Sequence, residues 1–194
     1  MKKIICLSLL VFSLIGHAQN AKGTFELTPF IGFASSNYST SEKNSNKPLT
    51  STNLGVNVDY FFSNRWSLRS GLIFHTMGSK YQYNGSNTEK LRYVTIPANA
   101  NWHFGKKRNW NLNFGLFMSF LTSATFNGDD MKDKVNSNQF GFNYGIGYTF
   151  KINDKFGILI DLQGVSGLTD VAKESSVSFT NVHSSFNIGG VFKL

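Results

Sequence analysis

Residues 139–151 read Gln-Phe-Gly-Phe-Asn-Tyr-Gly-Ile-Gly-Tyr-Thr-Phe-Lys, and this stretch decides the fold. Successive side chains of an extended chain point to opposite sides, so the aromatic and apolar residues at even positions share one face. The odd positions carry Gly, Asn, Gln, Thr and Lys. A long aromatic face opposite a small, polar face is typical of a strand whose outer side contacts lipid and whose inner side lines a crowded barrel lumen.

The same alternation recurs along the chain and predicts eight strands. They cover residues 25–33, 54–62, 66–75, 93–104, 110–121, 139–151, 156–165 and 185–194. Long connections (35–51, 78–90, 127–138 and 167–181) alternate with short turns (63–65, 105–109 and 153–154). Barrels of bacterial outer membranes have even strand numbers, short periplasmic turns and longer external loops. The predicted fold is therefore all-β: a single eight-stranded antiparallel transmembrane β-barrel with up-and-down meander order.

A soluble eight-stranded barrel is the structural alternative. It would turn the aromatic faces inward and the polar faces toward water. The interior of eight strands is too narrow for so many large rings, because it is just wide enough for ordinary side chains to fill. The pattern favours the membrane barrel.

The first residues predict export. Lys2 and Lys3 precede an apolar run over residues 4–15, and Gly16-His17-Ala18 provides small residues at a cleavage site. This pattern is typical of a secretory signal peptide, so residues 1–18 are expected to be removed and residues 19–194 to form the barrel domain. An uncleaved N-terminal anchor is the alternative. The only cysteine, Cys6, falls in the removed segment, so the mature chain is expected to have no disulfide and no cysteine metal site.

The charge balance is basic, with a formal net charge of +8. Basic proteins often meet nucleic acid or an anionic surface. An exported protein rarely meets nucleic acid, so we expect no nucleic acid partner and instead contact with lipids of the outer membrane of a Gram-negative cell.

Several stretches resemble the PorT-like family of small outer-membrane β-barrel proteins. They are Tyr93-Val94-Thr95-Ile96-Pro97, Phe114-Gly115-Leu116-Phe117, Leu121-Thr122-Ser123-Ala124, residues 142–150, Gly167-Leu168-Thr169-Asp170 and Gly190-Val191-Phe192-Lys193-Leu194. The resemblance extends over essentially the whole mature chain and implies an outer-membrane barrel. Some relatives assist protein secretion, so the resemblance implies an envelope or secretion protein as a partner. The terminal strand is expected to contact the barrel-assembly machinery.

Charged residues on the predicted inner faces suggest a buried network. They are Glu26, Asp59, Arg69, Lys151, Asp161 and Lys193. An eight-stranded barrel is filled by side chains, and charges inside it must pair or they are costly. We expect Arg69 to lie among Glu26, Asp59 or Asp161 in a structural ion-pair network. An ion or proton pathway is the functional alternative.

Lys106, Lys107 and Arg108 form a clear basic cluster in a predicted periplasmic turn. Aromatic rings gather at membrane interfaces, where cations meet anionic head groups. We therefore expect this turn to contact phospholipids of the inner leaflet, with docking of a periplasmic partner as the alternative. The predicted interface aromatics are Trp66, Trp102, Trp110 and Phe192.

Two further motifs contain residue types that also occur in functional sites. The first motif contains the residue types of a lipid-modifying enzyme, although their spacing is not specific to one. It consists of His183, Ser184 and Ser185, together with Glu174 to Ser176 in the preceding loop. Asp129, Asp130 and Asp133 could offer oxygen ligands to Ca²⁺, but Lys132 and Lys134 neutralise them. Polarity at the barrel rim explains the first motif and a solvated loop explains the second.

The sequence therefore predicts a non-enzymatic outer-membrane protein with a structural or interaction role in the cell envelope, without catalytic residues, cofactor or metal. A narrow porin-like channel or a carrier of hydrophobic ligands is the alternative. A lipid-modifying enzyme ranks below both. Phe30, Phe61, Phe117 and Leu159 fall on inner faces and argue against an open channel.

Overall fold

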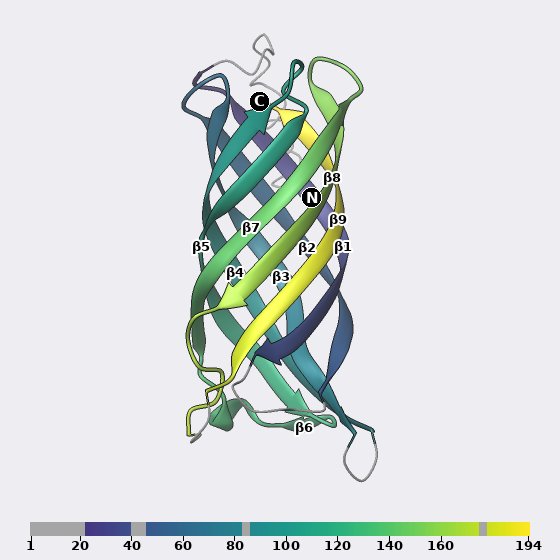
Figure 1. The fold of residues 1–194 in the computed structure, drawn as a ribbon, viewed down its shortest axis with the longest axis vertical. Coiled ribbons are helices and arrows are strands. Elements are labelled where there is room, and N and C mark those ends of the chain that lie inside the picture. The colour runs from purple at the N-terminus through teal and green to yellow at the C-terminus, as the bar shows by residue number, and fades with distance from the viewer. Residues whose placement is uncertain (1–21, 40–45, 83–85, 175–177) are drawn as a thin grey trace, which may run out of the picture.

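Eight long antiparallel strands close into a barrel in the computed structural model, which describes residues 22–39, 46–82, 86–174 and 178–194 (Figure 1). The strands are β1 (Phe25–Ser39), β2 (Lys47–Phe61), β3 (Trp66–Gln82), β4 (Ser86–Phe104), β5 (Trp110–Phe126), β7 (Asn138–Lys151), β8 (Phe156–Gly167) and β9 (Thr180–Lys193). A two-residue strand, β6 (Asp129–Asp130), and a short 3₁₀ helix, η1 (Lys132–Lys134), lie between β5 and β7. The predicted signal peptide, residues 1–18, lies outside the described residues.

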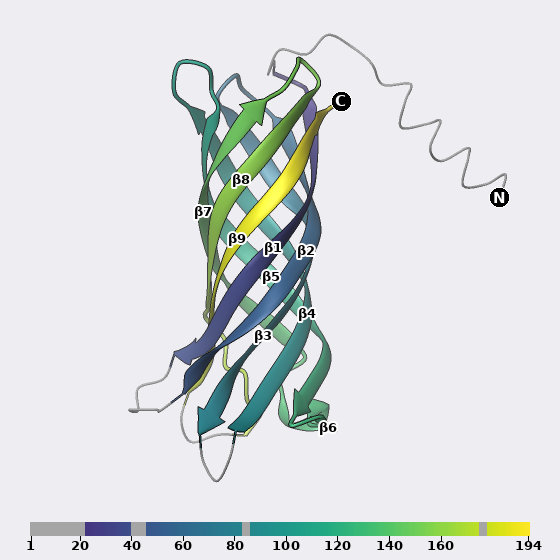
Figure 2. The same ribbon diagram turned by 90° about the vertical axis from the view of Figure 1, so that its right-hand side faces the viewer.

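Each long strand pairs with the next one along the chain, and β1 pairs with β9 to close the cylinder. This is the predicted meander order. Figure 2 shows the strands tilted around one axis, with the short turns and the C-terminus at one end and the long connections and β6 at the other. These ends are called the short-turn end and the long-loop end below. Among the described residues, no helix is long and apolar enough to cross a membrane.

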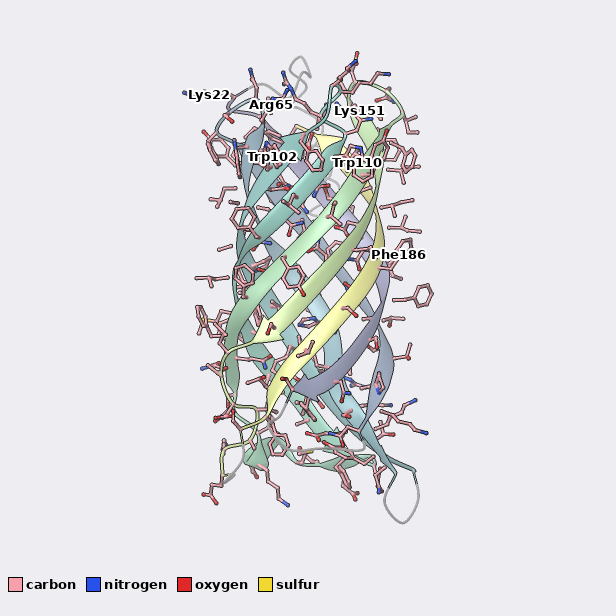
Figure 3. All side chains as sticks on the ribbon, viewed as in Figure 1. Lys22, Arg65, Trp102, Trp110, Lys151 and Phe186 are labelled. Atoms are coloured by element: carbon pink, nitrogen blue, oxygen red, sulfur yellow. The ribbon has the colours of Figure 1, made fainter. Side chains whose placement is uncertain are left out.

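The inner and outer faces are as predicted. On β7 the even-numbered residues from Phe140 to Ile146 and Phe150 are exposed, while Gln139, Gly141 and Asn143 are buried inside. Phe186 on β9 points away from the barrel at mid-height in Figure 3. The molecule thus carries its large apolar side chains outside and its amides inside, the reverse of a soluble protein and the arrangement that lipid requires.

An apolar belt surrounds the barrel. On β5 it runs from Trp110 through Leu112, Phe114, Leu116 and Met118 to Phe120, all of which are exposed. Ten residues of strand extend roughly 33 Å, and a tilt of about 45° converts this to a height of about 23 Å. This height matches the apolar band of about 25 Å on outer-membrane barrels.

The strands extend further than predicted at the long-loop end. β1 and β2 run into the predicted loop 35–51, and β3 and β4 run into the predicted connection 78–90. The predicted loop 127–138 contains β6 and η1, and β9 begins within the predicted loop 167–181. The predicted strands are shorter because outward side chains beyond the belt contact water and need not be apolar. The apolar alternation therefore stops there, while the backbone hydrogen bonds between strands continue.

The belt makes a testable prediction. Leu116→Arg places a charge near the middle of the belt and should lower the free energy of unfolding by about 2–4 kcal/mol. Thr50→Arg is the matched control, because Thr50 is also exposed but lies on β2 beyond the belt, where the cost should be about 0–1 kcal/mol. Urea unfolding in lipid vesicles, followed by tryptophan fluorescence, measures both. Equal losses of unfolding free energy in the two variants would contradict this position of the belt.

Candidate functional site

Arg69 and Asp59 form an ion pair inside the lumen. They lie directly opposite each other on β3 and β2, and Nε of Arg69 donates to Oδ2 of Asp59 at 2.9 Å. The other carboxylate oxygen, Oδ1, accepts hydrogen bonds from Oγ of Ser67 at 2.7 Å and from Nδ2 of Asn101 at 2.8 Å. Asp59 is fully buried. Its charge is therefore balanced by one cation and two neutral donors, as a carboxylate away from water requires.

Of the other predicted members of the network, Asp161 lines the same central cavity as Arg69, whereas Glu26, Lys151 and Lys193 lie at the short-turn end. Asp161 accepts from the amides of Asn187, at 2.7 Å, and Gln163, at 2.9 Å. Its carboxylate is thus held by neutral donors. Glu26 is buried opposite Lys193 on the β1–β9 ladder, at the short-turn end.

Lys151 is exposed at this same end. Its ammonium donates to the backbone carbonyl of Lys107 at 2.7 Å, in the turn between β4 and β5. Together with Arg108 and Lys193, it lines a small recess at the mouth of the barrel, above the buried Glu26. Of the six charged residues, Arg69 and Asp59 therefore form the central pair, and Asp161 accepts hydrogen bonds from amides. The other three, Glu26, Lys151 and Lys193, lie at the mouth of the lumen.

The centre of the lumen holds only a small cavity. Its volume is about 40 Å³, and Arg69, Asp161, His75 and His183 are among the residues that line it. A cavity needs at least roughly 10–15 Å³ of this kind of volume for each water, so the space suits only a few water molecules. The lumen is a packed interior rather than an open pore, as expected for eight strands.

Packed side chains separate this cavity from the short-turn end. Phe61 is fully buried, and its ring centroid lies 4.7 Å from that of His103. Nε2 of His103 lies within hydrogen-bond distance, 3.0 Å, of the Ser67 hydroxyl that also donates to Asp59. The ion pair therefore has an aromatic layer between it and the mouth.

An apolar plug fills the long-loop end. It consists of Tyr38, Met77, Leu91, Tyr93, Leu121, Ala124, Val135 and Val171. The last two come from different loops, which are joined by backbone hydrogen bonds from Asn136 to Val171 and from Lys173 to Lys134. Sequence reasoning missed this plug. The available signal was that Met77, Leu91 and Leu121, at inward positions close to or beyond the belt, are apolar.

A second cavity lies outside the plug, and we call it the outer cavity. It is lined by Tyr38, Tyr81, Glu89, Met131, Lys134, Val135, Val171, Ala172, Glu174 and Phe179, and its volume is about 230 Å³. The hydroxyl of Tyr81 donates to Oε2 of Glu89 at 3.0 Å. Glu89 lies five residues beyond Val94, the last belt position of β4, and is 9% exposed. Burial raises the pKa of its carboxyl, and the neighbouring tyrosine hydroxyls partly oppose this shift.

The enzyme motif does not form a triad among the described residues. His183 is buried, and its Nδ1 has no hydrogen-bond partner in the part of the chain that the structure describes. Its ring instead lies 5.0 Å from that of His75. Ser184 is exposed on the outer face, and residues 175–177 lie outside the described residues.

The calcium motif lies at the long-loop end, in β6 and η1. One oxygen of Asp130 accepts a hydrogen bond from the backbone N–H of Lys132 at 2.9 Å. Over residues 22–39, 46–82, 86–174 and 178–194, no three or more His, Cys, Asp or Glu side chains are arranged to hold a metal ion.

The short-turn end combines aromatic rings with a strong excess of basic charge. The rings of Trp66 and Trp102 stack at 6.1 Å, and neighbouring contacts continue through Phe104 to Trp110 and Tyr148. Phe192 contacts Phe156 at 5.1 Å. The basic residues are Lys22, Arg65, Lys106, Lys107, Arg108, Lys151, Lys155 and Lys193.

Figure 3 shows Lys22, Arg65 and Lys151 around this rim, beyond Trp102 and Trp110. Among the described residues, Asp154 is the one exposed acidic side chain in these turns. We call this set of cations the basic rim.

Comparison with known proteins agrees with this architecture. Residues 17–173 match the family model for the outer membrane protein beta-barrel domain. No curated protein matches the sequence.

The fold is also similar to that of solved outer-membrane proteins. The outer membrane protein OprG from Pseudomonas aeruginosa has a TM-score of 0.55 and 14% identity over 90% of this chain and 98% of that chain. Neisserial surface protein A has a TM-score of 0.56 and 14% identity over 92% of this chain and 100% of that chain. At these identities the likeness establishes the fold alone. Because the family model covers most of the sequence, the chain belongs to the outer membrane protein beta-barrel domain family and is a protein of the outer membrane.

Proposed function

We propose that this protein is a non-enzymatic component of the cell envelope that docks an acidic protein partner at its periplasmic end. In outer-membrane barrels the short turns face the periplasm and the longer loops face outward, so the basic rim is periplasmic. The observation that carries the proposal is that Arg108, Lys151 and Lys193 line the mouth of the lumen. A ring of cations with so few acidic neighbours attracts a partner of opposite charge.

Lipid contact alone accounts for only part of this rim. Lys106 and Lys107 are exposed next to the aromatic girdle and are suited to phospholipid head groups around the circumference. The mouth cations, in contrast, lie over the lumen, enclosed by the strand ends, and share their recess with inward residues such as Glu26 and Val191. Head groups surround the barrel, whereas a periplasmic protein can cover its mouth.

The resemblance to PorT-like proteins suggests protein secretion as the process in which such a partner acts. We therefore propose that the docked partner acts in protein secretion. We expect the contact between the terminal strand and the barrel-assembly machinery to occur while the barrel is being assembled, before it closes. In the finished barrel β9 is already paired with both β1 and β8, so that its edges are used.

A channel or hydrophobic-ligand carrier is the competing function. The small central cavity, the Phe61–His103 layer and the apolar plug all favour a closed interior. We expect purified protein in planar bilayers to give no stepwise conductance. Regular conductance steps from folded barrels, absent from boiled samples, would replace the docking proposal with a channel.

We propose a structural role for the Arg69–Asp59 pair. Arg69→Ala leaves the buried Asp59 carboxylate without its cation, and should lower the free energy of unfolding by about 3–5 kcal/mol. The double variant Arg69→Met/Asp59→Asn removes both charges and should recover most of this loss. The temperature at which the folded band disappears on cold gels ranks the three proteins. Unchanged heat resistance in Arg69→Ala would exclude a structural network.

Docking is tested by photo-crosslinking in living cells. A photoreactive amino acid at Asn64, which is exposed in a periplasmic turn, should crosslink to a reproducible protein with an acidic surface. Arg108→Glu/Lys151→Glu should reduce this product by about tenfold or more, because reversed charges at the mouth repel the partner. Lys90→Glu/Lys173→Glu, at the long-loop end, makes the same charge change and should leave the product intact. Crosslinks to lipid alone would refute protein docking.

A further inference from the structure

The outer cavity is assembled from five parts of the chain and faces away from the periplasm. β1 supplies Tyr38, β3 supplies Tyr81 and β4 supplies Glu89. The η1 region supplies Met131, Lys134 and Val135, and the segment before β9 supplies Val171, Ala172, Glu174 and Phe179. The floor is the apolar plug, since Tyr38, Val135 and Val171 belong to both. The cavity is therefore separate from the lumen and from the basic rim.

Glu89 provides a buried carboxyl group in this cavity. Its side chain accepts one hydrogen bond from Tyr81, but no cationic side chain among the described residues forms an ion pair with it. Tyr38 is 9% exposed and its hydroxyl lies beside the same carboxylate, without a hydrogen-bond partner of normal geometry in the described structure. A buried carboxylate normally has a cationic partner or a full set of donors. Glu89 therefore has capacity for a positively charged donor.

Three aromatic rings line the cavity that contains this carboxyl group. Tyr38 packs edge-on against Phe179, with ring centroids 6.3 Å apart, and Tyr81 adds a third ring to the wall. Met131 and Val171 complete an apolar surface. Aromatic faces attract cations, and the attraction strengthens where water is excluded. Rings, apolar walls and one carboxylate are together complementary to an ammonium group attached to an apolar body.

The charges at the entrance do not cancel this complementarity. Lys134 and Glu174 also line the cavity, but both are exposed and of opposite sign. Their contributions largely offset each other and are screened by solvent. Glu89 is left as the acidic group inside the cavity.

We propose that the outer cavity is a binding site for a small organic cation, an amine or quaternary ammonium compound with an apolar body. The ammonium group pairs with Glu89 and contacts the tyrosine rings, while the apolar body lies against Met131 and Val171. The volume of about 230 Å³ is below the range of roughly 300–1,000 Å³ found for drug-sized ligands, so the ligand is small. This site is independent of the docking proposed at the periplasmic end.

Titration of the folded protein in detergent with four probes tests this inference. Phenethylamine is the cationic probe, 2-phenylethanol is its neutral analogue, phenylacetate is the anion, and methyl glucoside represents sugars. We expect saturable binding of phenethylamine by calorimetry, and binding of the other three at least about tenfold weaker, because only the amine provides a cation for the buried carboxylate. This comparison requires no variant and so does not depend on the folding of one.

Two matched variants locate the site. Glu89→Gln keeps an acceptor for Tyr81 but removes the charge, and should weaken phenethylamine binding by about tenfold or more. Asp133→Asn makes the same charge change on the exposed surface of η1, outside the cavity lining, and should leave binding unchanged. The heat-dependent gel shift confirms that each variant is folded. Equal binding of amine and alcohol, preference for the sugar, unaltered binding in Glu89→Gln, or no saturable binding of phenethylamine would each overturn the proposal.

Discussion

The requirement that every backbone donor and acceptor inside lipid finds a partner within the chain governs this molecule. The pairing of β1 with β9 satisfies it, because closure leaves no strand edge exposed to hydrocarbon. Closure with only eight strands then fixes a narrow interior. Side chains must alternate between lipid and that interior, so the inside holds mostly small residues and amides, with a few large rings such as Phe61 and Phe117 and a few compensated charges.

The packed interior moves function to the two ends. Asp59 has little access to water and therefore relies on Arg69, Ser67 and Asn101 for compensation. Such an interior stabilises the barrel but leaves no continuous path for a solute. The periplasmic rim and the outer cavity, in contrast, are formed by residues beyond the belt, where polar side chains contact water and where loops bring together distant segments. Both proposed recognition sites lie in these regions, where the membrane does not restrict the composition.

Sequence alone predicted the strands, their order and their faces, because the period-two alternation is imposed by lipid on one side and by the lumen on the other. For Arg69 it left three possible carboxylate partners open, Glu26, Asp59 and Asp161. The structure pairs it with Asp59, which the short turn at residues 63–65 sets opposite Arg69 on the β2–β3 ladder. Sequence alone did not predict where the strands end, since the alternation is lost in water before the backbone ladder stops. The plug and the outer cavity were missed because residues from η1 and from the segment before β9 become neighbours only after closure.

The two ends should act independently of each other. Energetic coupling between distant sites requires an element with two alternative arrangements that both sites bias. Between the basic rim and the outer cavity lie the Phe61–His103 layer, the central ion pair and the apolar plug, all packed in a lumen whose cavity measures about 40 Å³. A closed ladder of eight strands around such a filled interior leaves little room for rearrangement. We therefore expect the barrel to act as a rigid support for the two proposed sites, the basic rim at the short-turn end and the outer cavity with its buried carboxyl group at the long-loop end. No signal should pass between them.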